Sequence, residues 1–72
     1  MAIKRKKLKA LLDSRGITAY RLSRILGYKD PFHVYRWIYG RGEPTARTML
    51  TLMDVLDATA EEILHAFADV EV

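Results

Sequence analysis

Residues 17–40, ITAYRLSRILGYKDPFHVYRWIYG, contain alternating helix start and stop signals that allow only short helices. Thr18 can cap a first helix, because its hydroxyl can accept hydrogen bonds from the exposed amides of the first turn. Gly27 can end that helix, since glycine adopts a left-handed backbone at little cost. Asp30 is a favoured N-cap, and Pro31 suits the first helical position that follows it. The segment therefore predicts two short helices joined by a turn of a few residues.

The rest of the chain predicts further helices and no convincing strand. Gly40 ends the second short pattern, and Thr45 can cap the helix that follows. Thr59 and Glu62 form a capping box, in which each side chain can reach the backbone amide of the other residue. Apolar residues at helical spacing mark the faces expected in the core: Leu8, Leu11, Leu12, Leu22, Leu26, Met49, Leu52, Met53, Leu56, Ile63, Leu64 and Phe67. We predict one all-α domain over residues 1–72, with helices at roughly 3–14, 19–26, 31–39, 45–56 and 60–67.

Charge divides the chain into a basic part and an acidic part. Residues 1–47 hold all 12 Lys and Arg with three acids, a formal charge of +9, and residues 48–72 hold six acids and no Lys or Arg, a charge of −6. The two parts together give the net charge of +3. A positive lobe beside a negative one indicates that one side of the molecule meets a polyanion. In the alternative interpretation, both are simply solvated faces.

Composition excludes several classes of protein. The chain has no Cys, which removes disulfides and thiolate metal sites and suits the cytoplasm, where we expect the protein. Its apolar runs are too short to cross a membrane, and its basic N-terminus has no signal-peptide pattern. His33 and His65 lie far apart in sequence without metal-ligand spacing, and no Gly-rich phosphate loop is present. We therefore expect no enzyme, no metal, no cofactor and no small-molecule substrate.

The order and spacing of several short motifs resemble one family. The motifs are Arg15-Gly16-Ile17-Thr18, Leu22-Ser23, Leu26-Gly27, Val34 with Trp37, Gly40-Arg41-Gly42-Glu43-Pro44 and Leu56-Asp57-Ala58-Thr59. Over about residues 8–67 the chain resembles the Cro/C1-type (XRE-like) helix-turn-helix family of phage repressors and bacterial regulators. The resemblance implies a compact five-helix, lambda-repressor-like domain, with its helix-turn-helix in the second and third helices. It also implies binding to operator DNA, usually as a two-fold dimer.

Three features depart from the family pattern. The turn between the second and third helices is one residue longer than usual, and the extra residue lies within residues 28–30. Many members pair an Arg late in the first helix with a Glu late in the third, whereas Leu12 and Ile38 stand here. An apolar pair can replace a buried ion pair at little cost, so we predict that these two side chains touch. Ala19 replaces a polar residue that helps fix the register on DNA.

The predicted third helix has two faces. One side suits the core and holds Val34, Trp37 and Ile38. The other has i, i+3, i+4, i+7 spacing and holds Phe32, Tyr35, Arg36 and Tyr39. An outward row of aromatics with an Arg is expected of a recognition helix lying in the major groove of DNA. In the alternative interpretation, Phe32 folds back into the core and the tyrosines cover helix edges.

We predict two sets of DNA contacts. Arg36 can bridge O6 and N7 of a guanine and Phe32 can pack on a thymine methyl group, and the predicted base contacts are Phe32, His33, Tyr35 and Arg36. The predicted phosphate contacts, around the second helix and the ends of the third, are Thr18, Tyr20, Arg21, Lys29, Tyr39 and Arg41. The basic run of residues 4–9 either follows the DNA as an arm or is simply solvated.

The function expected is a sequence-specific regulator of transcription, a repressor that binds double-stranded DNA as a homodimer. The dimer surface is expected in the acidic part, with candidates Leu50, Val55, Ala58, His65 and the Val70/Val72 tail. One alternative is an antitoxin-like protein-interaction module on the same fold. Another is a single-stranded nucleic acid binder that uses the aromatics of the third helix for stacking.

Overall fold

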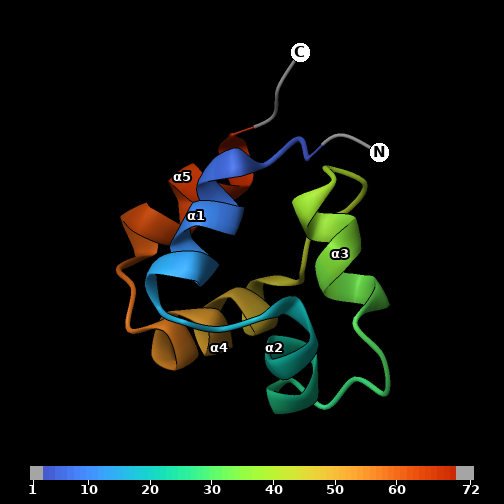
Figure 1. Ribbon diagram of the computed structural model, residues 1–72. Helices are drawn as coiled ribbons and strands as arrows, with labels where there is room; N and C mark the ends of the chain where they lie inside the picture. Colours follow the sequence, from blue (N-terminus) through green and yellow to red (C-terminus); the bar gives the residue numbers. More distant parts are fainter. Residues whose placement is uncertain (1–2, 70–72) are drawn as a thin grey trace.

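The computed structural model describes residues 3–69, which form five helices around one core (Figure 1). The helices are α1 (Lys6–Ser14), α2 (Ala19–Ile25), α3 (Phe32–Ile38), α4 (Ala46–Leu56) and α5 (Ala60–Ala68). The predicted all-α architecture is confirmed, and most helix ends lie within one residue of their predicted positions. The exception is α1, which begins at Lys6 because residues 3–5 run along the end of α3 instead of forming a helical turn.

Side-chain caps define three of the helix starts as predicted. The hydroxyl of Thr18 accepts from the backbone N–H of Arg21, and the hydroxyl of Thr45 accepts from that of Thr48. Thr59 begins α5 in a complete capping box. These bonds satisfy amides that have no partner inside the helix.

The start of α3 differs slightly from the prediction. Pro31 occupies the N-cap position, so the helix begins at Phe32. The carboxylate of Asp30 still accepts from the backbone N–H of Phe32 at 2.9 Å. Asp30 therefore supplies the capping oxygen, but from one residue further away than expected.

One face of every helix is buried in the core. Buried residues include Leu8 and Leu12 of α1, Leu22 of α2, and Leu52 and Leu56 of α4. The remaining large members are Val34, Trp37, Ile38, Ile63 and Phe67, and Leu11, Leu26, Met49 and Met53 pack partly buried against them. The predicted inward faces are thus largely confirmed.

Leu64 is the clear error in the predicted core, because its side chain is 59% exposed. The buried residues of α5 are Ile63, Ala66 and Phe67, which have i, i+3, i+4 spacing. Consecutive residues of a helix lie about 100° apart around its axis. Leu64 therefore projects away from the face that Ile63 buries.

α1 packs against α5, α2 against α3, and α4 against α5, so α3 lies at one side of the molecule (Figure 1). Leu12 of α1 and Ile38 of α3 are both buried in the same cluster, and both line one small pocket between α1, α2 and α3. This placement agrees with the predicted contact between them. The molecule measures 30 × 26 × 23 Å along its principal axes.

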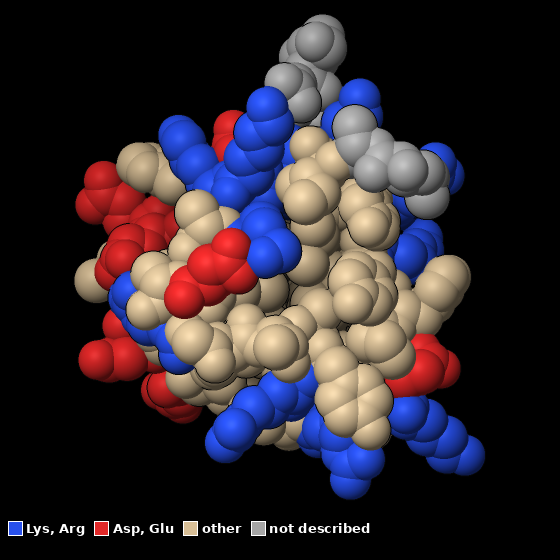
Figure 2. Space-filling model, in the orientation of Figure 1, with Lys and Arg blue, Asp and Glu red and all other residues tan. Residues whose placement is uncertain are grey.

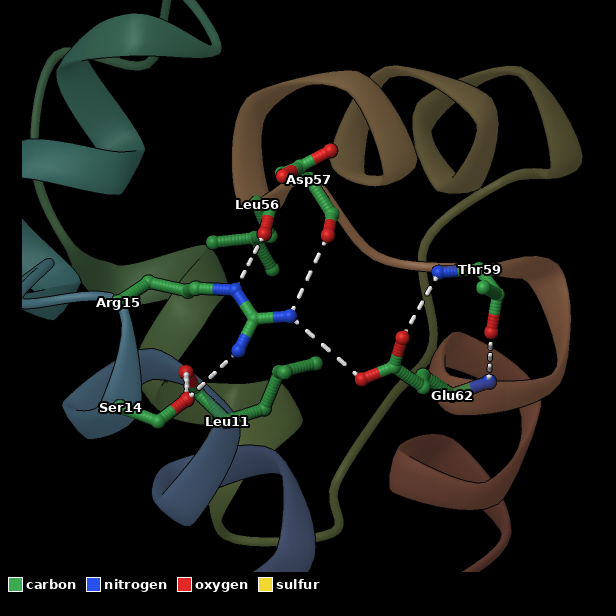
Figure 3. Close-up of polar contacts among 7 residues, drawn as sticks. All are labelled: Leu11, Ser14, Arg15, Leu56, Asp57, Thr59 and Glu62. Carbon is green, nitrogen blue, oxygen red and sulfur yellow. Dashed lines mark hydrogen bonds and ion pairs between the residues drawn. The ribbon is translucent and has the colours of Figure 1, made fainter.

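Arg15 joins the end of α1 to the corner between α4 and α5 (Figure 3). Its Nε donates to the carbonyl of Leu56 at 2.6 Å, and its Nη2 donates to that of Asp57 at 3.2 Å. The same nitrogen lies 3.5 Å from the carboxylate of Glu62. Because the last carbonyls of a helix lack intrahelical partners, Arg15 satisfies the end of α4 from the end of α1.

Among residues 3–69, no helix combines the length and apolar character needed to cross a membrane.

Candidate nucleic-acid interface

α3 has one buried and one exposed face, as its sequence predicts. Val34, Trp37 and Ile38 are at most 5% exposed. Phe32 is 60% exposed and Tyr35 43% exposed, and Arg36 is exposed beside them. Phe32 therefore does not fold back into the core. The exposed face is a surface that a ligand can reach without any movement of the core.

The exposed face of α3 forms one shallow groove with the loop that follows the helix. Its lining residues are Phe32, Tyr35, Arg36, Tyr39 and Arg41. The rings of Tyr35 and Tyr39 are nearly parallel, with centroids 6.2 Å apart and planes at 18°. We call these five residues the α3 groove. It is mainly aromatic, with a guanidinium group in its wall.

Arg36 is held in the α3 groove from two sides. Its guanidinium carbon lies 5.7 Å from the centroid of the Phe32 ring, within the range of a cation–π contact. Its Nη2 donates to the carbonyl of Arg41 at 3.1 Å, while the Arg41 backbone N–H donates to the Arg36 carbonyl at 2.8 Å. The side chain is therefore positioned before any ligand arrives.

His33 and Tyr28 form a second aromatic contact, beside the turn. Their ring centroids are 4.2 Å apart, and the Tyr28 ring also meets Trp37 edge-on at 6.2 Å. His33 is thus exposed on the flank of α3 and does not line the α3 groove. The turn between α2 and α3 is tied to α3 through Tyr28, a role that the sequence analysis missed. An aromatic residue directly after the Gly27 stop signal was the available clue.

The start of α2 carries several of the predicted phosphate contacts. Thr18, Tyr20 and Arg21 are all exposed there. The hydroxyl of Thr18 uses one lone pair on the Arg21 amide, so its O–H can still donate. The hydroxyl of Tyr20 accepts from Arg24 Nη1 at 3.1 Å, which holds a second cation at this surface. Lys29 and Arg41 are exposed at the two ends of α3.

Basic and acidic side chains occupy different regions of the surface. Figure 2 shows Asp and Glu gathered mainly along the edge of α4 and α5, and Lys and Arg below, near α2, and above, near the start of α1. The division seen in the sequence is therefore also a division in space. An approaching polyanion is attracted to the side that carries α2 and α3.

Arg5 fixes the end of α3, and the sequence analysis missed it. The residue is only 3% exposed, although it belongs to the run of residues 4–9 that was expected to be solvated or to reach DNA. Its Nη1 donates to the carbonyls of Trp37 at 2.8 Å and Gly42 at 2.6 Å, and its Nε donates to that of Phe67 at 3.0 Å. The backbone N–H groups of Lys4 and Arg5 both donate to the Ile38 carbonyl. The N-terminal segment thus holds the α3 groove in place.

The predicted dimer residues occupy different environments. Leu50 is 64% exposed and His65 is exposed, while Val55 is half-buried against the core. Ala58 is only 8% exposed and belongs to the core, so its assignment to a dimer surface was wrong. The cause is the turn at Asp57, whose left-handed backbone (φ 49°) directs the next residue inward. Val70 and Val72 lie outside the described residues.

A short turn between two helices, an exposed second helix and a basic surface around both define a helix-turn-helix DNA-binding domain. A family model of the Cro/C1-type helix-turn-helix DNA-binding domain matches residues 7–69, and the chain belongs to that family. The protein is accordingly a DNA-binding regulator of the Cro/C1 type. Comparisons with curated proteins and with solved structures gave no match.

Proposed function

We propose that the protein represses transcription in the cytoplasm by binding a two-fold operator as a homodimer, with α3 in the major groove. The α3 groove carries this proposal. It presents exposed Phe32, Tyr35 and Arg36 on a helix whose opposite face is fixed in the core. A recognition helix needs this combination, because base contacts demand both an accessible face and a defined orientation.

Base contacts are assigned to Arg36, Phe32, Tyr35 and His33. Arg36 retains four of its five N–H donors beyond the bond to Arg41, and a guanine offers O6 and N7 as paired acceptors. Phe32 offers only apolar surface. His33 lies at the edge of α3 against Tyr28 and reaches a base or a phosphate at the border of the site.

Phosphate contacts are assigned to two clusters. One lies at the start of α2 and comprises Thr18, Tyr20 and Arg21. The other flanks α3 and comprises Lys29, Tyr39 and Arg41. Contacts of this kind fix the register of the protein on the duplex without reading sequence.

A homodimer is proposed because one α3 reaches only a few base pairs. Two copies on half-sites about one helical turn apart double the number of base contacts. Exposed Leu50 is the proposed centre of the dimer surface, with Val55, His65 and the exposed Leu64 as further members. Ala58 is left out, because it is buried within the monomer.

The test begins with selection of binding sites from random duplex DNA. We expect a palindromic site, and affinity for it should fall steeply with salt, because each neutralised phosphate releases counterions. Arg36→Ala should relax the preference at one base pair in each half-site. The matched control, Arg21→Ala, should weaken binding to all sequences and reduce the salt slope by about 1. No enrichment of any site together with a flat salt response would contradict the proposal.

The stacked rings of Tyr35 and Tyr39 also suit unpaired bases, which bind to aromatic surfaces on basic proteins. Competition separates this second candidate from the first. Unlabelled single strands that displace the selected duplex at equal nucleotide concentration would favour single-strand binding. Under the duplex proposal, only the selected duplex should compete.

A further inference from the structure

The contact between Phe32 and Arg36 bears on which base pairs the α3 groove can read. The two residues are one helical turn apart, and the Arg36 guanidinium carbon lies 5.7 Å from the Phe32 ring centroid. The ring is 60% exposed, so its outer surface is open to a ligand. One apolar and one hydrogen-bonding group thus reach the same part of the groove together.

Two contacts favour this position of the guanidinium group. Its Nη2 is bonded to the Arg41 carbonyl, and the backbone at Gly42 is so close that a Cβ there would lie 3.5 Å from the same nitrogen. The loop after α3 therefore packs against one side of the guanidinium group while Phe32 covers another. Such a group is preorganised for a paired acceptor, and little entropy is lost when it binds.

The short distance between the two side chains limits them to base pairs that lie close together. Successive bases on a strand are about 3.4 Å apart along the duplex. The 5.7 Å between the Arg36 guanidinium carbon and the Phe32 ring centroid is less than two such steps. If Arg36 contacts a guanine, the Phe32 ring therefore lies no more than about two steps away, and the adjacent base pair is the nearest neighbouring position for it. The ring has no donor or acceptor, so the only major-groove feature it can distinguish there is a methyl group.

We propose that the α3 groove reads a two-base step in which a pyrimidine C5-methyl group lies beside a guanine. Arg36 binds O6 and N7 of the guanine, and Phe32 packs on the methyl group. Thymine supplies this methyl group in ordinary DNA. Cytosine methylated at C5 carries it at the same place in the major groove, so a methylated cytosine beside a guanine is read in the same way. The inference rests on the proposed function, since it requires α3 in the major groove.

The experiment changes single methyl groups in the duplex obtained by site selection. Each thymine beside a guanine is replaced by deoxyuridine, which removes the methyl group and leaves pairing and phosphates intact. Burial of one methyl group corresponds to about a fourfold change in affinity. We expect about that loss at one such thymine in each half-site, measured by fluorescence anisotropy at constant salt. Thymines away from guanine serve as the control and should show no loss.

Variants assign the effect to Phe32. Phe32→Ala should bind the thymine and deoxyuridine duplexes equally, and it should fold, because its ring is largely outside the core. Phe32→Leu should keep part of the difference, since it keeps apolar surface. The matched control, Ile25→Ala, removes an exposed apolar side chain of α2 outside the α3 groove and should preserve the full difference. In a second duplex with cytosine beside the guanine, methylation at C5 should strengthen binding by about the same factor.

The outcomes distinguish this inference from the function on which it rests. Equal affinity of the wild type for thymine and deoxyuridine at every position, with strong salt-dependent duplex binding, would overturn the methyl reading alone. A methyl effect that survives in Phe32→Ala would also overturn it. Absence of any specific duplex binding would overturn the proposed function, and the inference with it.

Discussion

Arg5 shows how one buried cation can define a recognition surface without touching the ligand. Its acceptors include Trp37 and Phe67, which lie in the last turns of α3 and α5. Carbonyls at the ends of helices lack intrahelical partners and carry partial negative charge, so a guanidinium group is favoured between them. Arg5 also approaches the carboxylate of Glu43 at 3.4 Å. Sequence alone placed this residue in a basic run that either follows the DNA or is solvated. No sequence pattern marks a buried Arg whose acceptors are backbone carbonyls of distant segments.

We expect Arg5→Met to lower the free energy of unfolding by at least about 3 kcal/mol, since each lost hydrogen bond from a charged donor contributes about 1.5–3 kcal/mol. Methionine fills the space but donates to none of the three carbonyls. Urea unfolding followed by circular dichroism measures the change. The control, Lys7→Met, alters an exposed neighbour of α1 and should stay within about 0.5 kcal/mol of the wild type. Equal stability of the two variants would show that the Arg5 bonds do not hold the fold.

The ionisation of Glu62 makes the stability of the fold depend on pH. The hydrogen bond from the backbone N–H of Thr59 is the largest effect and lowers the pKa of the Glu62 carboxyl below its ordinary 4.5. Desolvation opposes it, and the charge of Arg15 lowers the pKa further. A carboxyl group whose pKa is lower in the folded state than in the unfolded one stabilises the fold above the unfolded pKa. That contribution is lost as the pH falls through the folded pKa.

Glu62→Gln keeps an acceptor for the Thr59 amide but has no charge to lose. The melting temperature of the wild type should therefore exceed that of the variant at neutral pH, and the difference should shrink as the pH is lowered below 4.5. Thermal melts at a series of pH values measure it. A difference that is constant over this range would contradict the assignment of the effect to ionised Glu62.

At the scale of elements, the glycines that end α2 and α3 differ in what surrounds them. Gly27 has φ +88° and Gly40 has φ +75°, so alanine at either position costs about 1–2 kcal/mol in backbone strain. A Cβ at Gly27 would meet nothing within 4 Å, but a Cβ at Gly40 would lie 2.8 Å from the Cβ of Lys4. We expect Gly40→Ala to lose roughly 1–3 kcal/mol more than Gly27→Ala, because the N-terminal segment must move. Chemical unfolding of both variants gives the comparison, and equal losses would show that this segment moves freely.

The helices themselves were largely predictable from sequence, because their caps act locally. Thr18, Thr45 and Thr59 each cap as expected, and Gly27 and Gly40 adopt the left-handed backbone. The groove residues of α3 also followed from helical spacing alone. What sequence could not give were contacts between distant segments: the cap on the Lys7 amide comes from Asp69, and Arg15 binds carbonyls at the end of α4. Such partners are set by packing, and no local pattern encodes them.

At the scale of the whole molecule, the separated charges make the two proposed interfaces respond to salt in opposite directions. The DNA side is basic, so its affinity for a polyanion decreases as salt is added. The proposed dimer surface lies in residues 48–72, which carry a charge of −6, so two copies bring like charges together. Apolar contact at Leu50, which is 64% exposed, must then outweigh that repulsion. Like charges at an interface repel less as salt screens them.

We therefore expect self-association without DNA to strengthen between about 20 mM and about 500 mM salt, over which the Debye length falls from roughly 20 Å to roughly 4 Å. Sedimentation velocity of the free protein measures it. Leu50→Glu should weaken association at every salt concentration, because it removes apolar surface and adds a like charge. The control, Ile25→Glu, makes the same chemical change on exposed apolar surface of α2 and should leave association unchanged. Association that weakens with salt would instead indicate contact between the basic side of one copy and the acidic side of another. Such a head-to-tail contact would cover the α3 side and compete with DNA, so it would replace the proposed two-fold arrangement.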